Sequence, residues 1–293
     1  MSYTIITDTS SNIPTRMLRE QGLEVLPFMY YIDGKENVCL DTESFDGDAF
    51  YDMIRAGARV TTSQITPQQY VDCFEPILRA GNDIIFVSMS SGISGSCASA
   101  NMAANMLREK YPERKIKIID TRAASLGEGL VALYAAQLRD GGMDIDKAEE
   151  LLNDMSQRIC QIFTVDDLMH LRRGGRLSNL SAIVGTVLHI KPLLKGDNEG
   201  KIVAIAKVRG RKRSIEAIAE KYDKLVREPQ QQVVGIAQAG CREDAEYLAQ
   251  LLMRNNPPKE ILTVEYEPVT GSHVGPGALA LFFESHEKVR DDE

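Results

Sequence analysis

The sequence predicts an α/β protein of two domains, and three observations support this fold class. Apolar strand-like segments alternate with helical segments through the first half, as in the βαβ units of a parallel sheet. The second half differs, because a hairpin-like pair of strands near residues 190–207 precedes a strand–helix–strand pattern. The length of 293 residues accommodates one large domain or two ordinary ones.

The first half opens with short elements. Residues 3–7 form an apolar strand, and Asn12 is a candidate cap for a helix that has Pro14 in its first turn. A second strand is expected over residues 24–32. Asp33-Gly34 then gives a hairpin signal, which predicts a small β excursion from the sheet.

The elements that follow continue the alternation of strands and helices. Helical spacing of apolar residues predicts a helix within 45–56, and Thr66-Pro67 supplies the cap and first residue of another. Residues 83–89 and 116–119 are buried strands. We therefore expect a Rossmann-like, three-layer domain with a parallel sheet. Ligands bind at the carboxyl ends of such strands, where the candidate loops are 8–12, 90–96 and 120–129.

The second half predicts a separate α/β domain with a mixed or antiparallel sheet. An amphipathic helix over 144–158 leads into the apolar segment 158–165. The remaining expected elements are hairpin strands over 190–195 and 201–207, a helix over 215–225, a strand over 232–237, a helix over 242–254 and a strand over 261–266. We place the boundary near residue 158, which gives domains 1–158 and 159–293.

Composition and charge argue against several classes of function. The net charge of −8 disfavours a nucleic-acid-binding surface as the main function. No segment reaches the roughly 18 unbroken apolar residues of a membrane span, and the N-terminus lacks the features of a signal peptide, so we expect a cytoplasmic protein. The five cysteines are scattered without a CxxC pair and the four histidines lack metal-ligand spacing. Neither a disulfide framework nor a metal site is therefore expected.

Residues 90–96 (SSGISGS) give the sharpest local signal for a ligand. They follow a buried strand and open an alanine-rich helix, whose first turn offers unpaired N–H groups and positive potential. Glycine allows close approach of the backbone, and Ser91 and Ser94 add hydroxyl donors. A carboxylate or a phosphate fits such a site, and a helix start without a ligand is the alternative. The loop lacks the Gly-Lys-Ser/Thr ending of a Walker A motif.

Other segments also combine polar residues with a shaped backbone. Residues 61–64 (TTSQ) can supply hydroxyl donors to an anion or can form an extended loop. His273 precedes Val274-Gly275-Pro276-Gly277 and can donate a hydrogen bond to a carboxylate or transfer a proton. The basic clusters 171–177 and 207–213 can form a solvated face, or can dock an acidic partner protein or a phosphate.

Taken together, these motifs resemble those of the bacterial DegV family. The resemblance covers nearly the whole chain and keeps the family's order of motifs. These are DTSSN, TTSQ, SSGISGS, DTRAASLGEG, LRRGGRLS, IKPLLK, KVRGRKR and HVGPG. One departure is that the family usually has proline directly after TSQ, whereas here Ile65 follows and the proline is Pro67.

The resemblance implies one long-chain fatty acid buried between the two domains, with no cofactor. The residues that it implies for the carboxylate are Thr62, Ser63, Ser91, Gly92, Ser94 and His273. It also implies a carrier rather than an enzyme, because a partner fatty acid kinase subunit would supply ATP and phosphorylate the bound carboxylate for phospholipid synthesis. Arg176 and Arg209 would face that partner. No catalytic residue, metal, nucleic acid or membrane span is implied, and transient contact with a membrane surface stays open.

A serine esterase or acyltransferase is the alternative from a different class. Ser91 or Ser94 would be the nucleophile, with His273 as the base and Asp120 as the orienting acid. The GxSxG nucleophile elbow is absent from the serine–glycine loop. The carrier is therefore the leading hypothesis.

Overall fold

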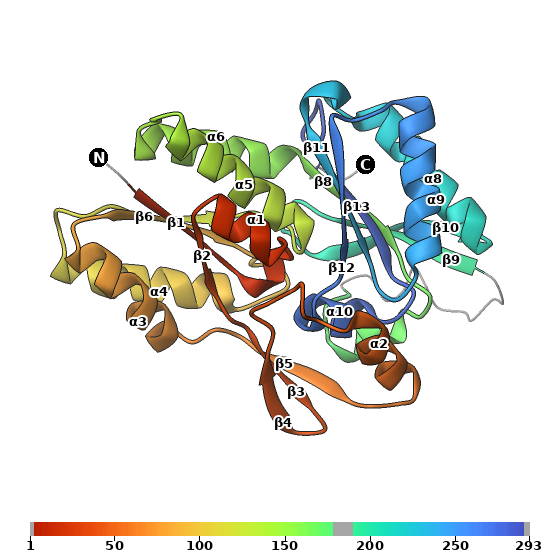
Figure 1. Cartoon of the computed structure of the whole chain (residues 1–293), viewed down its shortest axis with the longest axis horizontal. Helices are drawn as coiled ribbons and strands as arrows, with labels where there is room; N and C mark the ends of the chain where they lie inside the picture. The colour runs from red at the N-terminus through yellow and green to blue at the C-terminus, as the bar shows by residue number, and fades with distance from the viewer. Residues whose placement is uncertain (1–2, 178–189, 290–293) are drawn as a thin grey trace.

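The structure is a computed structural model that describes residues 3–177 and 190–289. It contains a parallel sheet formed by the first half of the chain, a mixed sheet formed by the second half, and a small antiparallel sheet below both (Figure 1). The α/β class is confirmed. The mixed character expected for the second sheet is also confirmed.

The first sheet has the strand order β2-β1-β6-β7, and all its neighbouring strands are parallel. Its strands are β1 (Tyr3–Asp8), β2 (Leu23–Leu26), β6 (Asp83–Ser88) and β7 (Ile116–Asp120). Every residue of β6 is buried, as expected for a parallel strand covered on both faces. The carboxyl ends of the four strands consequently lie along one edge of the sheet.

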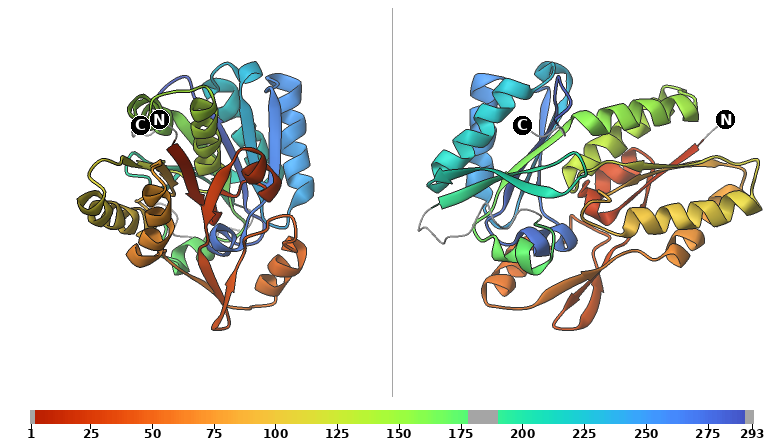
Figure 2. Two further views of the ribbon diagram at one scale, coloured as in Figure 1. Left: turned by 60° about the vertical axis from the view of Figure 1, so that its left-hand side comes forward. Right: turned by 180° about the vertical axis from the view of Figure 1, so that it is seen from behind.

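Helices cover both faces of this sheet, which gives the three layers predicted from the sequence. α3 (Pro67–Arg79) and α4 (Ser96–Lys110) pack on one face. α5 (Leu126–Asp140) and α6 (Ile145–Arg158) lie on the other face, as Figure 2 shows from behind. α3 begins as predicted, because Thr66 and Gln69 form a reciprocal capping box in front of Pro67.

The role expected for Asn12 is wrong. Asn12 has a positive φ of 58° and ends a short 3-10 helix, η1 (Thr9–Ser11), while α1 (Thr15–Glu20) starts after Pro14 without a side-chain cap. The Asn12 side chain instead reaches the second half of the chain, where Nδ2 donates to the carbonyl of Glu265 at 2.8 Å. Asn12 therefore makes a long-range contact instead of capping the helix that follows it.

The predicted strand over 24–32 is two strands, because the chain leaves the first sheet after β2. β3 (Met29–Ile32) pairs with β4 (Lys35–Val38) and β5 (Val60–Ser63) in the small antiparallel sheet. The turn at Asp33-Gly34 has positive φ at both residues, 48° and 85°, as the hairpin signal predicts. The expected β excursion is confirmed.

The excursion is fastened to the second half of the chain through α2 (Gly47–Arg55). The Tyr51 hydroxyl donates to the carbonyl of Tyr266 at 2.6 Å, and Arg55 Nη2 donates to the carbonyl of Gly240 at 2.8 Å. The Glu265 carboxylate packs directly on Gly47, and a side chain there would displace it. These contacts hold β5 between the two halves of the molecule.

The second sheet has the order β10-β9-β8-β13-β11-β12. Its strands are β8 (Ile159–Thr164), β9 (Ile190–Gly196), β10 (Ile202–Arg209), β11 (Val233–Gln238), β12 (Glu260–Glu265) and β13 (Leu279–Glu284). α8 (Arg211–Leu225) and α9 (Arg242–Asn255) cover its outer face (Figure 1). The sequence did not predict β13, although this strand pairs antiparallel with both β8 and β11.

The inner face of the second sheet packs against the start of α5, so this helix lies between the two sheets. A Cβ at Gly235 of β11 would meet the Leu126 side chain at 2.9 Å, and a Cβ at Gly127 would meet the Phe282 ring at 3.1 Å. Glycine at these two positions allows the close approach of helix and sheet. One hydrophobic core therefore continues from the first sheet across α5 to the second.

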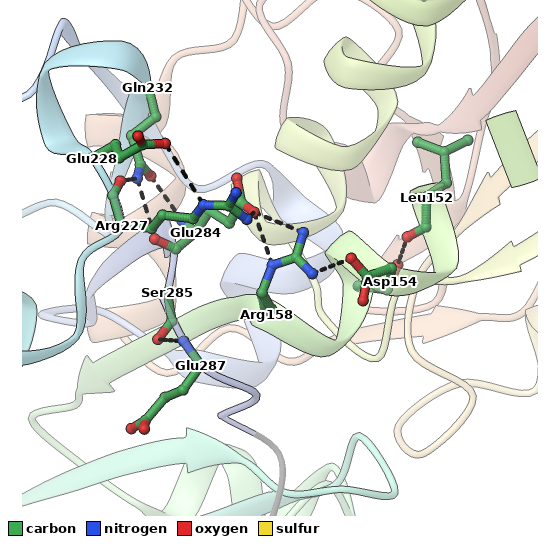
Figure 3. Close-up of polar contacts among 10 residues, drawn as sticks. Leu152, Asp154, Arg158, Arg227, Glu228, Gln232, Glu284, Ser285 and Glu287 are labelled. Carbon is green, nitrogen blue, oxygen red and sulfur yellow. Dashed lines mark hydrogen bonds and ion pairs between the residues drawn. The ribbon is translucent and has the colours of Figure 1, made fainter. Parts of the chain in front are cut away.

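The chain passes from α6 into β8 at Arg158, which anchors this junction (Figure 3). Its guanidinium pairs with Asp154 of α6 and lies 2.9 Å from Glu284 at the end of β13. Arg227 binds the same Glu284 carboxylate at 3.2 Å. The junction falls at the boundary expected near residue 158, and the division into domains 1–158 and 159–293 remains a proposal.

Candidate functional site

A cavity of about 290 Å³ lies between the two halves of the chain. Its apolar wall comprises Phe28, Met89, Ile93, Ala124, Phe163, Leu171, Ile202, Tyr266, Val269, Val274 and Phe282. The polar residues in the wall are Thr62, Ser63, Gln64, Ser94, Gly95, Ser125, Gln161, Arg176, Thr270 and His273. This mixture of an apolar wall with a few polar groups is typical of small-molecule sites.

The carboxyl-end loops of the first sheet supply one side of this cavity, as the fold class predicts. The loop after β6 contributes Met89 and residues 93–95, and the loop after β7 contributes Ala124 and Ser125. The third candidate loop, residues 8–12, does not line the cavity. Its side chains are hydrogen-bonded within the core instead.

Thr62 and His273 form the central polar contact of the site. β5 carries Thr62, and α10 (Pro268–Val274) carries His273 in its last turn. Thr62 Oγ1 lies 2.8 Å from His273 Nε2, although the two residues are 211 positions apart. Burial first, and then the nearby Arg176 charge, lower the pKa of His273 to about 4, so its ring is neutral at neutral pH.

A neutral His273 ring carries one N–H donor and one ring-nitrogen acceptor. Gly174 packs directly beside this ring, because a Cβ there would lie 2.5 Å from Nδ1. Gly174 therefore makes room for the histidine, whereas Gly175 adopts a positive φ of 72°. This gives a physical reason for the glycines within the first basic cluster.

Ser94 belongs to the loop that opens α4. Its hydroxyl donates to Ser96 Oγ at 3.1 Å, and Ser96 Oγ also accepts from the backbone N–H of Ile65 at 3.1 Å. A Cβ at Gly95 would displace the Gln64 amide, which packs directly against this glycine. The TTSQ segment and the serine–glycine loop are thus held together at the cavity wall.

Ser91 and Gly92 do not line the cavity, in contrast to Ser94. Ser91 is exposed, and its hydroxyl donates to Asp120 at 2.6 Å. A Cβ at Gly92 would collide with the backbone of Glu199 and Gly200 in the β9–β10 turn. The first part of the loop therefore fixes the contact between the two halves, while its second part faces the cavity.

Arg176 lies in the cavity wall and is half-buried. Its Nε donates to the carbonyl of Ile93 at 3.1 Å, and Nη1 donates to the carbonyl of Gly174. No carboxylate pairs with it within residues 3–177 and 190–289, and burial lowers its pKa. Arg209, by contrast, is exposed and does not line the cavity.

A half-buried guanidinium that lacks a carboxylate partner favours an anionic ligand. The hydroxyls of Thr62 and Ser94 lie in the same wall, and each could turn its single O–H from its present partner toward a ligand. An anion bound here would gain charge-assisted hydrogen bonds, and the apolar wall would accept a long hydrocarbon group. The geometry therefore suits an amphipathic carboxylate or phosphate.

The catalytic arrangement of a serine hydrolase is not assembled. Ser91 is bonded to Asp120, and the ring nitrogen of His273 is bonded to Thr62. The Ser94 hydroxyl donates to Ser96. Neither candidate nucleophile is hydrogen-bonded to the candidate base among the described residues, which removes the main structural support for that alternative.

Three buried carboxylates lie outside the cavity wall. The Ser10 hydroxyl lies between two of them, in contact with Asp8 Oδ1 and 2.9 Å from Glu128 Oε2, and burial raises the pKa of both carboxyl groups. Glu267 caps α10 by accepting from the backbone nitrogens of Val269 and Thr270 at 2.7 and 2.6 Å. In the part of the chain that the structure covers, no cluster of three His, Cys, Asp or Glu residues could hold a metal ion.

Comparison with known proteins identifies the family. A family model described as "Uncharacterised protein, DegV family" matches residues 2–286. A DegV domain-containing protein of Clostridium perfringens is 37% identical over 281 residues, which cover 96% of this chain and 97% of the relative. The chain belongs to the DegV family.

Solved structures of DegV proteins share the fold over almost the full length. A structure described as fatty acid binding of a DegV family protein from Thermus thermophilus has a TM-score of 0.87 and 28% identity, covering 97% of this chain and 100% of that one. A fatty-acid-binding DegV family protein from Streptococcus agalactiae has a TM-score of 0.85 and 29% identity, covering 98% and 100%. No helix within the described part of this chain is long and apolar enough to cross a membrane.

Sequence reasoning missed most of the wall that the second half contributes. Gln161 and Phe163 come from β8, Phe282 comes from β13, and Tyr266 precedes α10. Gln161 had a recognisable signal, because it is a single amide within the apolar strand ICQIFT. An amide in a buried strand requires hydrogen-bond partners, so its position marks a polar feature of the interior.

Proposed function

We propose that this protein binds one long-chain fatty acid in the cavity between its two halves and presents the carboxylate to a partner. The partner would be an ATP-dependent fatty acid kinase subunit that forms the acyl phosphate in the cytoplasm, for phospholipid synthesis. The observation that carries the proposal is Arg176, which has no carboxylate partner among the described residues and lies in the cavity wall near the neutral Thr62–His273 pair. The fatty-acid-binding DegV structures described above support the ligand class.

The energetics suit a ligand held mainly by its hydrocarbon chain. About 15 methylenes at ~0.8 kcal/mol each would contribute on the order of 12 kcal/mol when buried. Association costs on the order of 4–15 kcal/mol offset part of this gain. Hydrogen bonds from hydroxyls and Arg176 would therefore orient the carboxylate and add affinity.

The structure suggests different roles for the two arginines. Arg176 lies in the cavity wall, where it can reach the carboxylate, and this position makes a purely partner-facing role less suitable. Arg209 is exposed on β10 and stays our candidate for contact with the partner. Of the other residues proposed for the carboxylate, Thr62, Ser63, Ser94 and His273 line the cavity, whereas Ser91 and Gly92 would act through the loop backbone.

Native mass spectrometry of the purified protein, followed by denaturing extraction, tests ligand binding. We expect one fatty acid per chain, and protein that stays empty after incubation with C14 to C18 acids would refute the proposal. Thr62→Val removes the hydroxyl at nearly constant volume and should weaken binding, whereas Thr61→Val on the exposed side of the same strand serves as the matched control. Labelling of Ser91 or Ser94 by a fluorophosphonate probe would instead favour the hydrolase.

Presentation to a partner requires a separate assay. With a reconstituted kinase subunit and ATP, we expect acyl phosphate formation from bound acid and none without the partner. Arg209→Ala should reduce this turnover while the affinity for fatty acid stays unchanged. His273→Ala should also impair it, and full turnover of that variant would remove His273 from the site.

A further inference from the structure

Gln161 places an unused polar group in the wall of the cavity. The residue is 6% exposed, and it lies on β8 with its side chain on the same face as Phe163, which also lines the cavity. Its Oε1 accepts a hydrogen bond from the backbone nitrogen of Ala124 at 3.2 Å. Because that partner is a donor, the amide oxygen must face Ala124 and the NH₂ group must point elsewhere.

The NH₂ group of Gln161 has no hydrogen-bond partner among the described residues, although it carries two N–H donors. The amide nitrogen is not among the fully buried side-chain atoms that lack a partner, so it is accessible from the cavity rather than enclosed in the core. Phe163 and Phe282, the nearest wall residues on β8 and β13, supply only aromatic rings. The missing acceptor is therefore expected to come from whatever fills the cavity.

A second polar feature adjoins Gln161 at the start of α5. Ser125 precedes this 15-residue helix, and no side-chain hydrogen bond caps it. Its hydroxyl donates away from the cavity, to Asn12 Oδ1 at 3.1 Å, which leaves the oxygen lone pairs available. Ser125 and Ala124 both line the cavity next to the Gln161 amide. The wall thus offers N–H donors beside a helix N-terminus, where positive potential favours an electron-rich group.

We propose that this protein prefers a fatty acid whose acyl chain bears an oxygen substituent, a hydroxyl or an oxo group, at the depth of Gln161. The substituent oxygen would accept from Gln161 Nε2, and a hydroxyl could donate in return to Ser125 Oγ. This proposal rests on the proposed function, because the carboxylate must occupy the Thr62–His273–Arg176 end. It adds a second polar subsite, which determines the class of acyl chain.

Binding of hydroxystearic acids tests the proposal, with the hydroxyl placed at successive positions along the chain and stearic acid as the reference. We expect one position, or two adjacent ones, to bind about tenfold more tightly than stearic acid, which corresponds to ~1.4 kcal/mol. The oxo analogue at that position should share the preference. Equal or weaker binding at every position would overturn the inference.

Variants locate the effect at Gln161. Gln161→Leu removes the NH₂ group, together with the acceptor of the Ala124 N–H, and should lose the preference for the substituted acid over stearic acid. Phe163→Leu is the matched control on the same face of β8, and it should change the affinity for all acids while keeping their ratio. A preference that persists in Gln161→Leu would refute the role of this residue. Failure of every acid to bind would refute the proposed function instead, so the two failures are distinguishable.

Discussion

Replacing Arg176 by glutamine should weaken fatty acid binding without weakening the unliganded protein. The guanidinium is half-buried, its Nε and Nη1 donate only to the carbonyls of Ile93 and Gly174, and no carboxylate pairs with it among the described residues. Hydrogen bonds to a charged group contribute ~1.5–3 kcal/mol. Loss of one such bond to the ligand carboxylate should therefore raise the Kd about 10- to 150-fold.

The same substitution has a second consequence. Removal of a partly desolvated charge without a carboxylate partner offsets the loss of its two hydrogen bonds to carbonyls, so the Tm of the empty protein should change little. At a ligand concentration of about 100 times the wild-type Kd, ligand binding adds ~2.7 kcal/mol of stability to the wild type. A variant with a 100-fold higher Kd should gain only ~0.4 kcal/mol under the same conditions.

Thermal unfolding with and without palmitic acid, together with direct titration, measures both effects. Arg176→Lys keeps the charge and should retain part of the affinity, and Arg209→Gln is the exposed control that should bind normally. An unchanged Kd for Arg176→Gln would refute the reasoning. If turnover with the partner kinase were lost at the same time, Arg176 would be assigned to the partner contact.

Two further predictions concern stability. Burial raises the pKa of Asp8 and Glu267 to about 7, so the folded protein holds more protons than the unfolded chain between about pH 4.5 and 7, and stability should fall as the pH rises through this window. Urea unfolding at pH 5 and pH 8 should show a smaller difference for Glu267→Gln than for the wild type, and equal differences would contradict the assignment. Arg158→Ala should cost about 1 kcal/mol, because the junction pairs with Asp154 and Glu284 are partly exposed. A double-mutant cycle with Glu284→Gln that shows no coupling would indicate that the network in Figure 3 does not stabilise the junction.

The sequence predicted the elements whose signals are local. The capping box at Thr66, the turn at Asp33-Gly34 and the buried run of β6 each depend on residues a few positions apart. The strand over residues 24–32 and the cap at Asn12 were wrong for the same physical reason. In both cases a partner far along the chain, β5 or Glu265, overrides the local preference.

The residues of the candidate site also separate into those with a local sequence signal and those placed by distant parts of the chain. Ser94 and Thr62 belong to short motifs with recognisable hydroxyls and glycines, so the sequence could single them out. The 2.8 Å contact between Thr62 and His273 depends on how α2 fastens the excursion to the second half, and no local pattern encodes that distance. The wall residues of β13 depend on strand order, because β13 lies between β8 and β11 rather than beside its sequence neighbour.

The apolar wall of the cavity and the Gln161 amide would make different contributions to the recognition of a fatty acid. The apolar wall contributes affinity, but one methylene more or less in an apolar pocket changes binding by only ~1–3 kcal/mol. Chain length alone would therefore be selected weakly. A buried amide that needs an acceptor discriminates more strongly between ligands, because the wrong ligand leaves it unpaired. In β8, Gln161 has two different ends: its Oε1 accepts from the Ala124 N–H, which leucine or valine could not do, and its NH₂ group faces the cavity without a partner among the described residues. The oxygen of this amide has a structural partner in Ala124, so the NH₂ group is the part that we propose selects among acyl chains, and the position scan would show that selection directly.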